Sequence, residues 1–380
     1  MDFNYTDEQL MIKQTARDFA EENLAPGVME RDEEAKYPVE QIKMMAELGF
    51  MGMVVPDKWQ GAGMDFVSYV IAIEELARVD ASAAVVMSVN NSLVCQIFLN
   101  WCNDQQRAKY LPRLATGEIL GAYSLSEPQS GSDASAMRTF ARKDGDHYVL
   151  NGTKNWVTNG ISSDVAIVYA LTTKGIGYKG VSAFIVEKGW EGFSVGKKED
   201  KLGIRGSDTC EFYFDNCRIP VENLVGEEGK GFKIAMNTLD GGRIGIAAQA
   251  LGIAQAALDK SIVYAKEREQ FGQPIANFGA THDKLSNMAC NVDAARLLIH
   301  RAAMLKDENK RFTKEGAMAK YFATKIAMEA TTLCVQIFGG YGYMREYGVE
   351  RLMRDAKITQ IYEGTSEIQQ LVIARELLRD

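Results

Sequence analysis

The chain lacks the cysteine and histidine patterns that build disulfide scaffolds and zinc sites. Its six cysteines are scattered through 380 residues with no CxxC pair, and its three histidines are not at metal-ligand spacing. Few, dispersed cysteines in a large chain are typical of a reducing compartment, and no metal site is expected. The net charge of -8 and the lack of a basic face argue against a nucleic-acid partner.

Long apolar runs and targeting signals are also missing. No stretch is long and apolar enough to predict a helix that spans a bilayer. The first eight residues have neither a basic region nor an apolar core, and the chain contains no Walker A sequence and no GxSxG elbow. We therefore expect a soluble cytoplasmic protein, or a mitochondrial-matrix protein if the chain is a processed eukaryotic one.

The composition is that of a globular protein, 46% hydrophobic and 25% charged, at a length that suggests two or three domains. Residues 1–118 predict an all-helical domain, which opens with a capping-box sequence at Thr6–Gln9. The helical period returns over residues 227–380. One helical stripe there has apolar residues at intervals of three and four: Leu285, Met288, Val292, Ala295 and Ile299. Short breaks between long helical stretches indicate an antiparallel bundle.

Residues 119–226 have a strand pattern instead. Asn151-Gly152 between two β-rich runs predicts a hairpin with a type I′ turn. Because no helical stretch separates the predicted strands, a small antiparallel β-domain or barrel is favoured over a parallel sheet. The segment 175–180 matches GxGxxG, but a strand follows it, so we interpret it as an inter-strand loop. The predicted fold class is multi-domain α+β, in the order helices, strands, helices.

Glu363 is the carboxylate with the most informative surroundings, between Tyr362 and Gly364. The glycine permits a turn and lets a ligand approach the backbone. In an apolar pocket, desolvation would raise the carboxyl pKa toward the value that a general base needs. The alternative is a loop carboxylate paired with Arg354 or Lys357.

The residues after Glu363 predict the start of a final helix. Ser366 and Gln369 have capping-box spacing, and the helix is expected over 368–378. The first amides of such a helix lack internal partners and favour a phosphate group.

Two segments of the β-region could hold a flat, polar cofactor. The segment 124–133 is small, polar and glycine-bearing, although it could equally be a loop that leads into the β-domain. Trp156 and Thr158 share one face of a strand, where an indole would stack on a heteroaromatic ring and a hydroxyl would bond to it. The alternative is a strand with one buried tryptophan.

Three segments of the helical region are further candidates. Asp240 and Arg243 share a helix face beside two glycines, whose cost of about 1 kcal/mol each relative to alanine suggests the close approach of a ligand. A surface ion pair is the alternative. Arg268 could supply a guanidinium that pairs with a phosphate, and Phe271 an aromatic platform. The alternative is a helix C-terminus at which Arg268 complements the helix dipole. The glycine-rich segment 336–342 follows a helix and could be a simple C-cap.

Taken in order, these motifs resemble the acyl-CoA dehydrogenase family over essentially the whole chain, and most of all its short-chain, butyryl-CoA type. The motifs are Leu-Ser-Glu-Pro-x-x-Gly-Ser-Asp (125–133), Trp-x-Thr (156–158), Asp-x-x-Arg (240–243), Arg-x-x-Phe-Gly (268–272), Gln-x-x-Gly-Gly (336–340) and Tyr-Glu-Gly-Thr-Ser-Glu (362–367). The resemblance implies a helical domain (1–118), a middle antiparallel β-domain (119–226) and a C-terminal four-helix domain (227–380).

The resemblance also implies an activity, a cofactor and partners. The activity is FAD-dependent α,β-dehydrogenation of short-chain acyl-CoA to trans-2-enoyl-CoA, part of fatty acid β-oxidation. Glu363 is implied as the base that removes the α-proton, while the β-hydrogen leaves as hydride to the flavin. Family members are usually homotetramers that pass electrons to an electron-transferring flavoprotein, so both partners are expected here.

The resemblance assigns binding roles residue by residue. The implied FAD contacts are Tyr123, Leu125, Ser126, Gly131, Ser132, Trp156, Thr158, Arg268, Phe271, Gln336, Gly339, Gly340, Thr365 and Glu367, of which Arg268, Phe271 and the 336–340 segment usually serve a neighbouring subunit. The implied substrate contacts are Ser132, Asp240, Arg243, Tyr362 and Gly364.

Two positions refine this picture. Some family members carry the base immediately before the arginine of Asp-x-x-Arg, where this chain has Gly242, so the base is expected at Glu363. A glutamine that often reaches FAD is replaced by Gly279, and His282 or a water is the expected substitute.

Three alternatives stay open on sequence alone. The protein could be a medium- or branched-chain acyl-CoA dehydrogenase, or an acyl-CoA oxidase on the same fold. A catalytically silent acyl-CoA-binding scaffold is the non-enzyme alternative, against which the presence of Glu363 argues.

Overall fold

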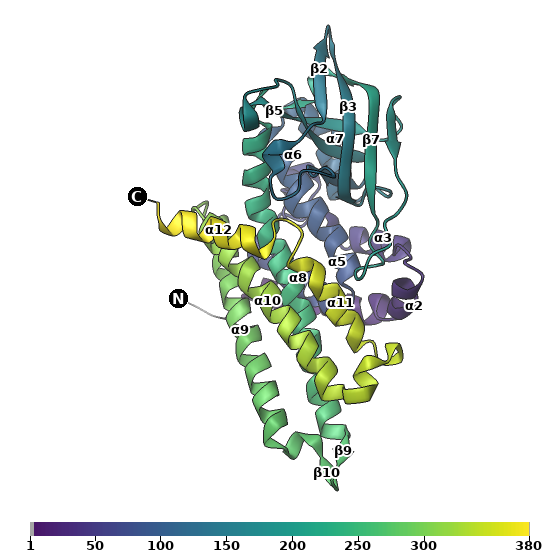
Figure 1. Cartoon of the computed structure of the whole chain (residues 1–380), viewed down its shortest axis with the longest axis vertical. Helices are drawn as coiled ribbons and strands as arrows, with labels where there is room; N and C mark the ends of the chain where they lie inside the picture. Colours follow the sequence, from purple (N-terminus) through teal and green to yellow (C-terminus); the bar gives the residue numbers. More distant parts are fainter. Residues whose placement is uncertain (1–3, 380) are drawn as a thin grey trace.

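The structure, a computed structural model, describes residues 4–379 (Figure 1). Its first part is helical: α1 (Asp7–Phe19), α2 (Val28–Glu33), α3 (Val39–Glu47), α4 (Phe66–Val79), α5 (Ala81–Ser88), α6 (Gln96–Trp101) and α7 (Asp104–Ala115). The predicted capping box at Thr6 is confirmed. The Thr6 hydroxyl accepts from the Gln9 amide, and the Gln9 side chain accepts from the Thr6 amide.

The expectation that no stretch could span a membrane by its composition was wrong. The segments α5, Val89–Cys95 and α6 form one helix of 21 residues, Ala81–Trp101, which is long and apolar enough to cross a bilayer. However, 89% of its apolar window is buried inside the protein. The apolar side chains of this helix therefore belong to the core of the molecule, as expected of a helix that the rest of the protein covers.

The middle part is an eight-stranded sheet: β1 (Gly121–Ser124), β2 (Phe140–Asp144), β3 (His147–Thr158), β4 (Val165–Leu171), β5 (Val181–Glu187), β6 (Phe193–Val195), β7 (Thr209–Pro220) and β8 (Leu224–Val225). The strand order is β6-β7-β3-β2-β4-β5-β8, with β1 beside β4. The sheet is mainly antiparallel, as predicted, but β1 pairs with β4 in parallel, as does the single β2–β4 contact. The GxGxxG segment lies between β4 and β5, so its interpretation as an inter-strand loop is confirmed.

The predicted hairpin at Asn151-Gly152 was wrong. β3 runs straight through this dipeptide, and the register against β7 shifts between Leu150 and Gly152, which is a β-bulge. Gly152 has φ +144°, and a Cβ there would lie 2.7 Å from the Cα of Thr139. A bulge and a type I′ turn both favour glycine, so the dipeptide alone could not separate them. The turn that joins β2 to β3 follows Asp144 instead.

The strands β4 and β5 are buried on both faces, as the alternation along β4 shows. Val165, Ile167 and Tyr169 join the large core shared with the helices, whereas Ala166, Val168 and Ala170 join a second, smaller core within the β-region. Successive side chains of a strand point to opposite faces, so this continuous apolar strand serves two cores. The sheet is thereby fixed against the helices.

The last part is helical again: α8 (Gly231–Glu267), α9 (Gly279–Asp307), α10 (Thr313–Phe338), α11 (Val349–Thr359) and α12 (Ser366–Leu377), with a two-stranded ribbon of β9 (Glu269–Gln270) and β10 (Gln273–Pro274). In Figure 1 the ribbon lies at the end of the molecule opposite the large sheet. The predicted stripe on α9 is confirmed, because Met288, Val292, Ala295 and Ile299 are buried. Domain boundaries at 118 and 226 stay predictions.

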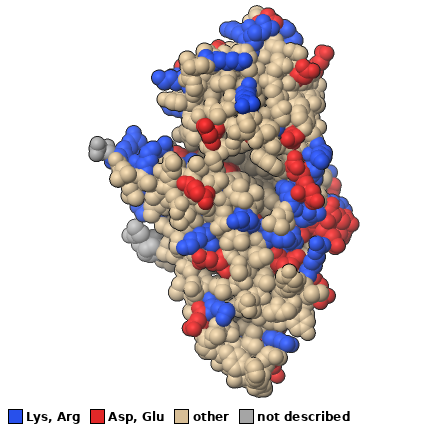
Figure 2. Space-filling view, viewed as in Figure 1, with Lys and Arg blue, Asp and Glu red and all other residues tan. Residues whose placement is uncertain are grey.

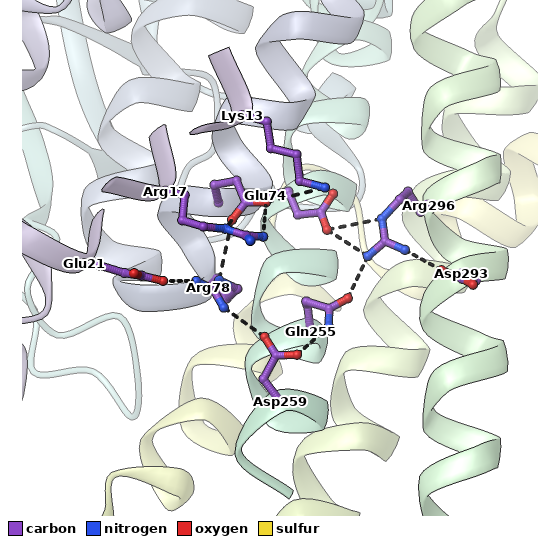
Figure 3. Close-up of polar contacts among 10 residues, drawn as sticks. Lys13, Arg17, Glu21, Glu74, Arg78, Gln255, Asp259, Asp293 and Arg296 are labelled. Atoms are coloured by element: carbon purple, nitrogen blue, oxygen red, sulfur yellow. Dashed lines mark hydrogen bonds and ion pairs between the residues drawn. The ribbon is translucent and has the colours of Figure 1, made fainter. Parts of the chain in front are cut away.

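A charged network joins the first and last helical parts (Figure 3). Two buried carboxylates on α4 each accept from an arginine of another helix: Arg17 of α1 to Glu75 at 2.9 Å, and Arg296 of α9 to Glu74 at 2.9 Å. Arg78 of α4 also pairs with Asp259 of α8 at 2.9 Å. Buried carboxylates need such partners, so the network fixes α8 and α9 against α4.

Candidate active site

A cavity of about 740 Å³ lies between the sheet and the helices. In Figure 2 the surface is hollowed between the sheet and the helices beneath it. The cavity brings together twelve of the residues singled out in the sequence: Tyr123, Leu125, Ser126, Gly131, Ser132, Trp156, Thr158, Arg243, Tyr362, Glu363, Gly364 and Thr365. Segments far apart in the chain thus meet at one site, of a size typical of small-molecule pockets.

Glu363 lines this cavity, and no residue within 4–379 forms an ion pair with it. Its Oε2 is buried and accepts no hydrogen bond within residues 4–379. Burial raises its carboxyl pKa to about 7, although Lys320 and Arg243 act in the opposite direction. The alternative of a loop carboxylate paired with Arg354 or Lys357 is wrong, because Arg354 binds Asp32 and Lys357 binds Gln360. A carboxyl half-ionised near neutral pH can accept a proton from a ligand.

The turn that carries Glu363 is held in an uncommon backbone conformation. Glu363 has φ +52° and Gly364 has φ +94°. For a residue with a Cβ, this left-handed conformation costs about 1–3 kcal/mol and persists only where the surroundings impose it. Lys320 donates to the carbonyls of Tyr362 (2.8 Å) and Gly364 (2.5 Å), and Gln369 donates to the Gly364 carbonyl at 2.9 Å.

The predicted capping box of Ser366 and Gln369 was wrong, and the helix begins two residues before the predicted start at 368. α12 begins at Ser366, and its N-cap is Thr365, whose hydroxyl accepts from the Ile368 amide. The Gln369 side chain turns back to the carbonyls of the Glu363 turn instead of the N-cap amide. Hydrogen bonds to the Glu363 turn thus take the place of the predicted capping box.

The two glycines beside Arg243 have different neighbours. A Cβ on Gly242 would lie 2.1 Å from the Glu363 Oε2 and 2.7 Å from Leu93. A Cβ on Gly241 would meet only Lys306 Nζ, at 3.3 Å, and more distant atoms. The two glycines suggested that a ligand lies close to this helix. At position 242, it is the side chain of Glu363 that lies close to the backbone. A residue with a Cβ at 242 would compete with Glu363 for the same space.

The opposite wall is built by β3 and the loop after β1. Trp156 is 62% exposed, so the alternative of a buried tryptophan is wrong, and both Trp156 and Thr158 line the cavity. The buried Lys154 fixes the loop to the strand, because its Nζ donates to the Leu125 carbonyl (3.0 Å) and to Glu127 (2.8 Å). An uncovered indole beside a polar loop offers a stacking surface for a flat ring.

Asp240 lies beside this cavity without lining it. Its carboxylate accepts from Arg243 at 2.5 Å and from Thr313 at 2.7 Å. Both side chains of the pair are largely buried, so the alternative of a surface ion pair was wrong. The Nε of Arg243 is buried without a hydrogen-bond partner among the described residues. Arg243 therefore has one donor that the described part of the chain leaves unused.

Another group of predicted cofactor contacts lies away from the cavity. Arg268 caps the C-terminus of α8, and Phe271, in the turn between β9 and β10, is 94% exposed. Gly339 and Gly340 have open space where a Cβ would be, at the same end of α10 as Gln336. Glu367 does not line the cavity either, although it is exposed in the first turn of α12 next to the lining residues Thr365 and Ile368. One chain does not bring these residues to the cavity.

Gly279 begins α9 in open space, so the position offers no side chain to a ligand. The ring of His282 is already bonded to the carbonyl of Ala276 at 2.6 Å.

Sequence reasoning missed the residues that support the site from behind. Lys320, Gln369 and Lys154 are buried, and the Tyr362 hydroxyl donates to the buried Gln249. One signal was present: Lys320 falls on the same helical stripe as Ala317 and Ala323, where an apolar residue is expected.

Family models match nearly the whole chain. They are the acyl-CoA dehydrogenase N-terminal domain at residues 6–118, the middle domain at 122–217 and the C-terminal domain at 229–378. A short-chain specific acyl-CoA dehydrogenase of Clostridium acetobutylicum is 48% identical, with all of both chains covered.

Solved structures agree with these matches. Butyryl-CoA dehydrogenase from Megasphaera elsdenii has 50% identity, full coverage of both chains and a TM-score of 0.98. A chain in a structure described as the electron transferring flavoprotein of Acidaminococcus fermentans has 51% identity, full coverage of both and a TM-score of 0.99. The fold predicted from the resemblance is confirmed, and the chain belongs to the acyl-CoA dehydrogenase family.

Proposed function

We propose that this protein catalyses the FAD-dependent α,β-dehydrogenation of short-chain acyl-CoA thioesters to trans-2-enoyl-CoA. The observation that carries the proposal is the unpaired carboxyl of Glu363, whose pKa is raised to about 7, in a cavity with Trp156 and Thr158. The relatives named as short-chain specific support the substrate class.

The cavity fits a flavin ring and a thioester. Trp156 presents an uncovered aromatic face, Gly131 has no neighbour within 4 Å of a Cβ, and Thr158 adds a hydroxyl. These features suit a flat heteroaromatic group with polar edges. In the proposal Tyr123, Leu125, Ser126, Gly131, Ser132, Trp156 and Thr158 hold the flavin half of FAD, and Thr365 and Glu367 contribute from the start of α12.

The chain's own residues then supply proton transfer and positioning. Glu363 accepts the α-proton of the thioester, and its amide, which donates no hydrogen bond within residues 4–379, is available to the thioester oxygen. Hydrogen bonds to that oxygen stabilise the developing enolate charge. FAD, when bound, accepts the β-hydrogen as hydride. In the proposal Ser132, Arg243, Tyr362 and Gly364 line the path of the substrate, and Asp240 contributes from beside the cavity through its bond to Arg243.

The contacts remote from the cavity support a multi-subunit assembly. Phe271, Gln336, Gly339 and Gly340 are exposed in one chain, and the half-buried Arg268 lies over the ring of Tyr341 beside them, at the end opposite the sheet (Figure 1). In the proposal a second copy brings this surface to the adenine and pyrophosphate half of FAD, within a homotetramer. An electron-transferring flavoprotein is the proposed acceptor, and the cytoplasm the proposed location.

Anaerobic reduction of bound flavin across C4 to C12 acyl-CoAs tests the function. We expect flavin bleaching to be fastest with butyryl-CoA and to slow with chain length. Fastest bleaching at C8 or longer would favour the medium-chain alternative. In a separate aerobic assay, rapid oxygen consumption would favour the oxidase alternative. A purified protein without flavin absorbance would favour the acyl-CoA-binding scaffold.

The rate of flavin reduction at limiting butyryl-CoA should rise with pH through about 7 and then level off. The carboxyl of Glu363 is protonated below its raised pKa of about 7 and cannot accept the α-proton there. At limiting substrate, the pH dependence reports groups of the free enzyme. Stopped-flow rates from about pH 5.5 to 9 measure this, and a flat profile would contradict the assignment.

A further inference from the structure

Lys320 is a lysine buried in the centre of α10. Its side chain is 0% exposed, and it forms no salt bridge among residues 4–379. Its Nζ donates to the carbonyls of Tyr362 (2.8 Å) and Gly364 (2.5 Å), the residues on either side of Glu363. A buried cation without a salt bridge is costly, so its presence here calls for a reason beyond packing.

Hydrogen bonding alone would not require a charge at this position. Gln369, a neutral amide, donates to the carbonyls of Glu363 (3.2 Å) and Gly364 (2.9 Å) from the other side of the turn. Three consecutive carbonyls are thus held by two side chains. What Lys320 adds to this arrangement is an ammonium group beside Glu363. Burial lowers the pKa of this ammonium to about 7, while Glu363 acts to raise it, so Lys320 carries its positive charge below about pH 7 and loses it as the pH rises.

The two donors also set the direction of the backbone amide. No cis peptide occurs in residues 4–379, and in a planar trans peptide the C=O and the following N–H point in opposite directions. Because the Tyr362 carbonyl points to Lys320, the Glu363 amide points away from Lys320. The bonds to Lys320 therefore orient the amide of Glu363.

Charged and titratable groups face this pair from several elements. Glu363 is faced by Lys320 of α10, Arg243 of α8, Tyr69 of α4 and Tyr123 of β1, and by Tyr362 in its own turn. Lys320 is faced by Glu363, then Arg243 and Glu367. Arg243 is already paired with Asp240 at 2.5 Å. Of these two basic residues, Lys320 is thus the one that forms no salt bridge within residues 4–379.

We propose that Lys320 is a positioning residue for the dehydrogenation: it holds the Glu363 turn in its left-handed conformation and keeps the carboxylate available as a base near neutral pH. The inference rests on the proposed function, since it assigns a support to the base. Lys320 touches neither substrate nor flavin, and it acts through Glu363.

Lys320→Met and Lys320→Gln separate the charge from the hydrogen bonds. In Lys320→Met, we expect the anaerobic flavin-reduction rate with saturating butyryl-CoA to fall on the order of 100-fold, the effect of misplacing a catalytic group by about 1 Å. The midpoint of the pH profile should also rise, because Lys320 favours the carboxylate of Glu363 while it is protonated and this effect is lost. Lys320→Gln keeps a donor, so its rate should fall less while its midpoint rises equally.

Two further variants make the test specific. Gln369→Leu removes a neutral donor, so the rate should fall without an alkaline shift of the midpoint. Lys325→Met removes an exposed cation of the same helix, 3.8 Å from Glu329, and should match the wild type. All are compared as FAD-loaded enzyme, and the pH midpoint does not depend on the folded fraction.

The outcomes are distinguishable. If wild-type enzyme is not bleached by butyryl-CoA, the proposed function fails. If the wild type is active and both Lys320 variants keep its midpoint within about 0.3 units and its rate within about threefold, the inference about Lys320 is overturned. If Lys320→Met does not fold, the midpoint of Lys320→Gln decides: an alkaline shift supports the proposal, and a wild-type midpoint overturns it.

Discussion

Glu363→Gln is expected to bind FAD and butyryl-CoA normally and to lose flavin reduction by about 10²–10⁴-fold, the range for a positioned general base. The amide has nearly the shape of the carboxylate but cannot accept the α-proton. Oε2 accepts no hydrogen bond within residues 4–379, so the substitution breaks no hydrogen bond of that atom. Stopped-flow bleaching at 450 nm (roughly the flavin maximum) measures the rate, and a butyryl-CoA titration measures binding.

The variant also removes a buried carboxyl, so its thermal midpoint should equal or exceed that of the wild type. This separates loss of chemistry from loss of structure. Bleaching by butyryl-CoA at the wild-type rate would refute the assignment of Glu363 as the base and, with it, the mechanism.

Gly242→Ala is expected to slow flavin reduction on the order of 100-fold without unfolding the protein. The new Cβ would lie 2.1 Å from the Glu363 Oε2, so the carboxylate must move. Its backbone cannot follow, because Lys320 and Gln369 hold the carbonyls of the turn. A displacement of about 1 Å at the reacting group is enough for a loss of this size.

Gly241→Ala is the matched control, one residue earlier on α8. Its Cβ would meet only the flexible end of Lys306 at 3.3 Å and atoms farther away. Both substitutions raise helix propensity by about 1 kcal/mol, so a propensity effect would appear in both variants. Equal rates for the two, each near the wild type, would show that the geometry at position 242 does not constrain the base.

Local sequence patterns predicted helices and caps correctly where the pattern is compatible with only one local structure. The stripe on α9 and the capping box at Thr6 follow from helix geometry alone, and both are present. The Asn151-Gly152 hairpin was wrong because glycine permits a bulge as readily as a turn, and pairing with β7 made the choice. The cap at Ser366 was wrong because the side chain that would complete it, Gln369, bonds to the Glu363 turn.

The order of motifs by itself determined the family, the three-part organisation and the identity of the carboxylate at the site, because these depend on residue types at short spacing. Only the tertiary structure decided which residues support that carboxylate. Lys320 lies 42 positions from Tyr362, and Gln249 lies 113 positions from it. The pKa of Glu363 and the need for glycine at 242 depend on burial and on atoms packed across helices, and neither is set by neighbours in the chain.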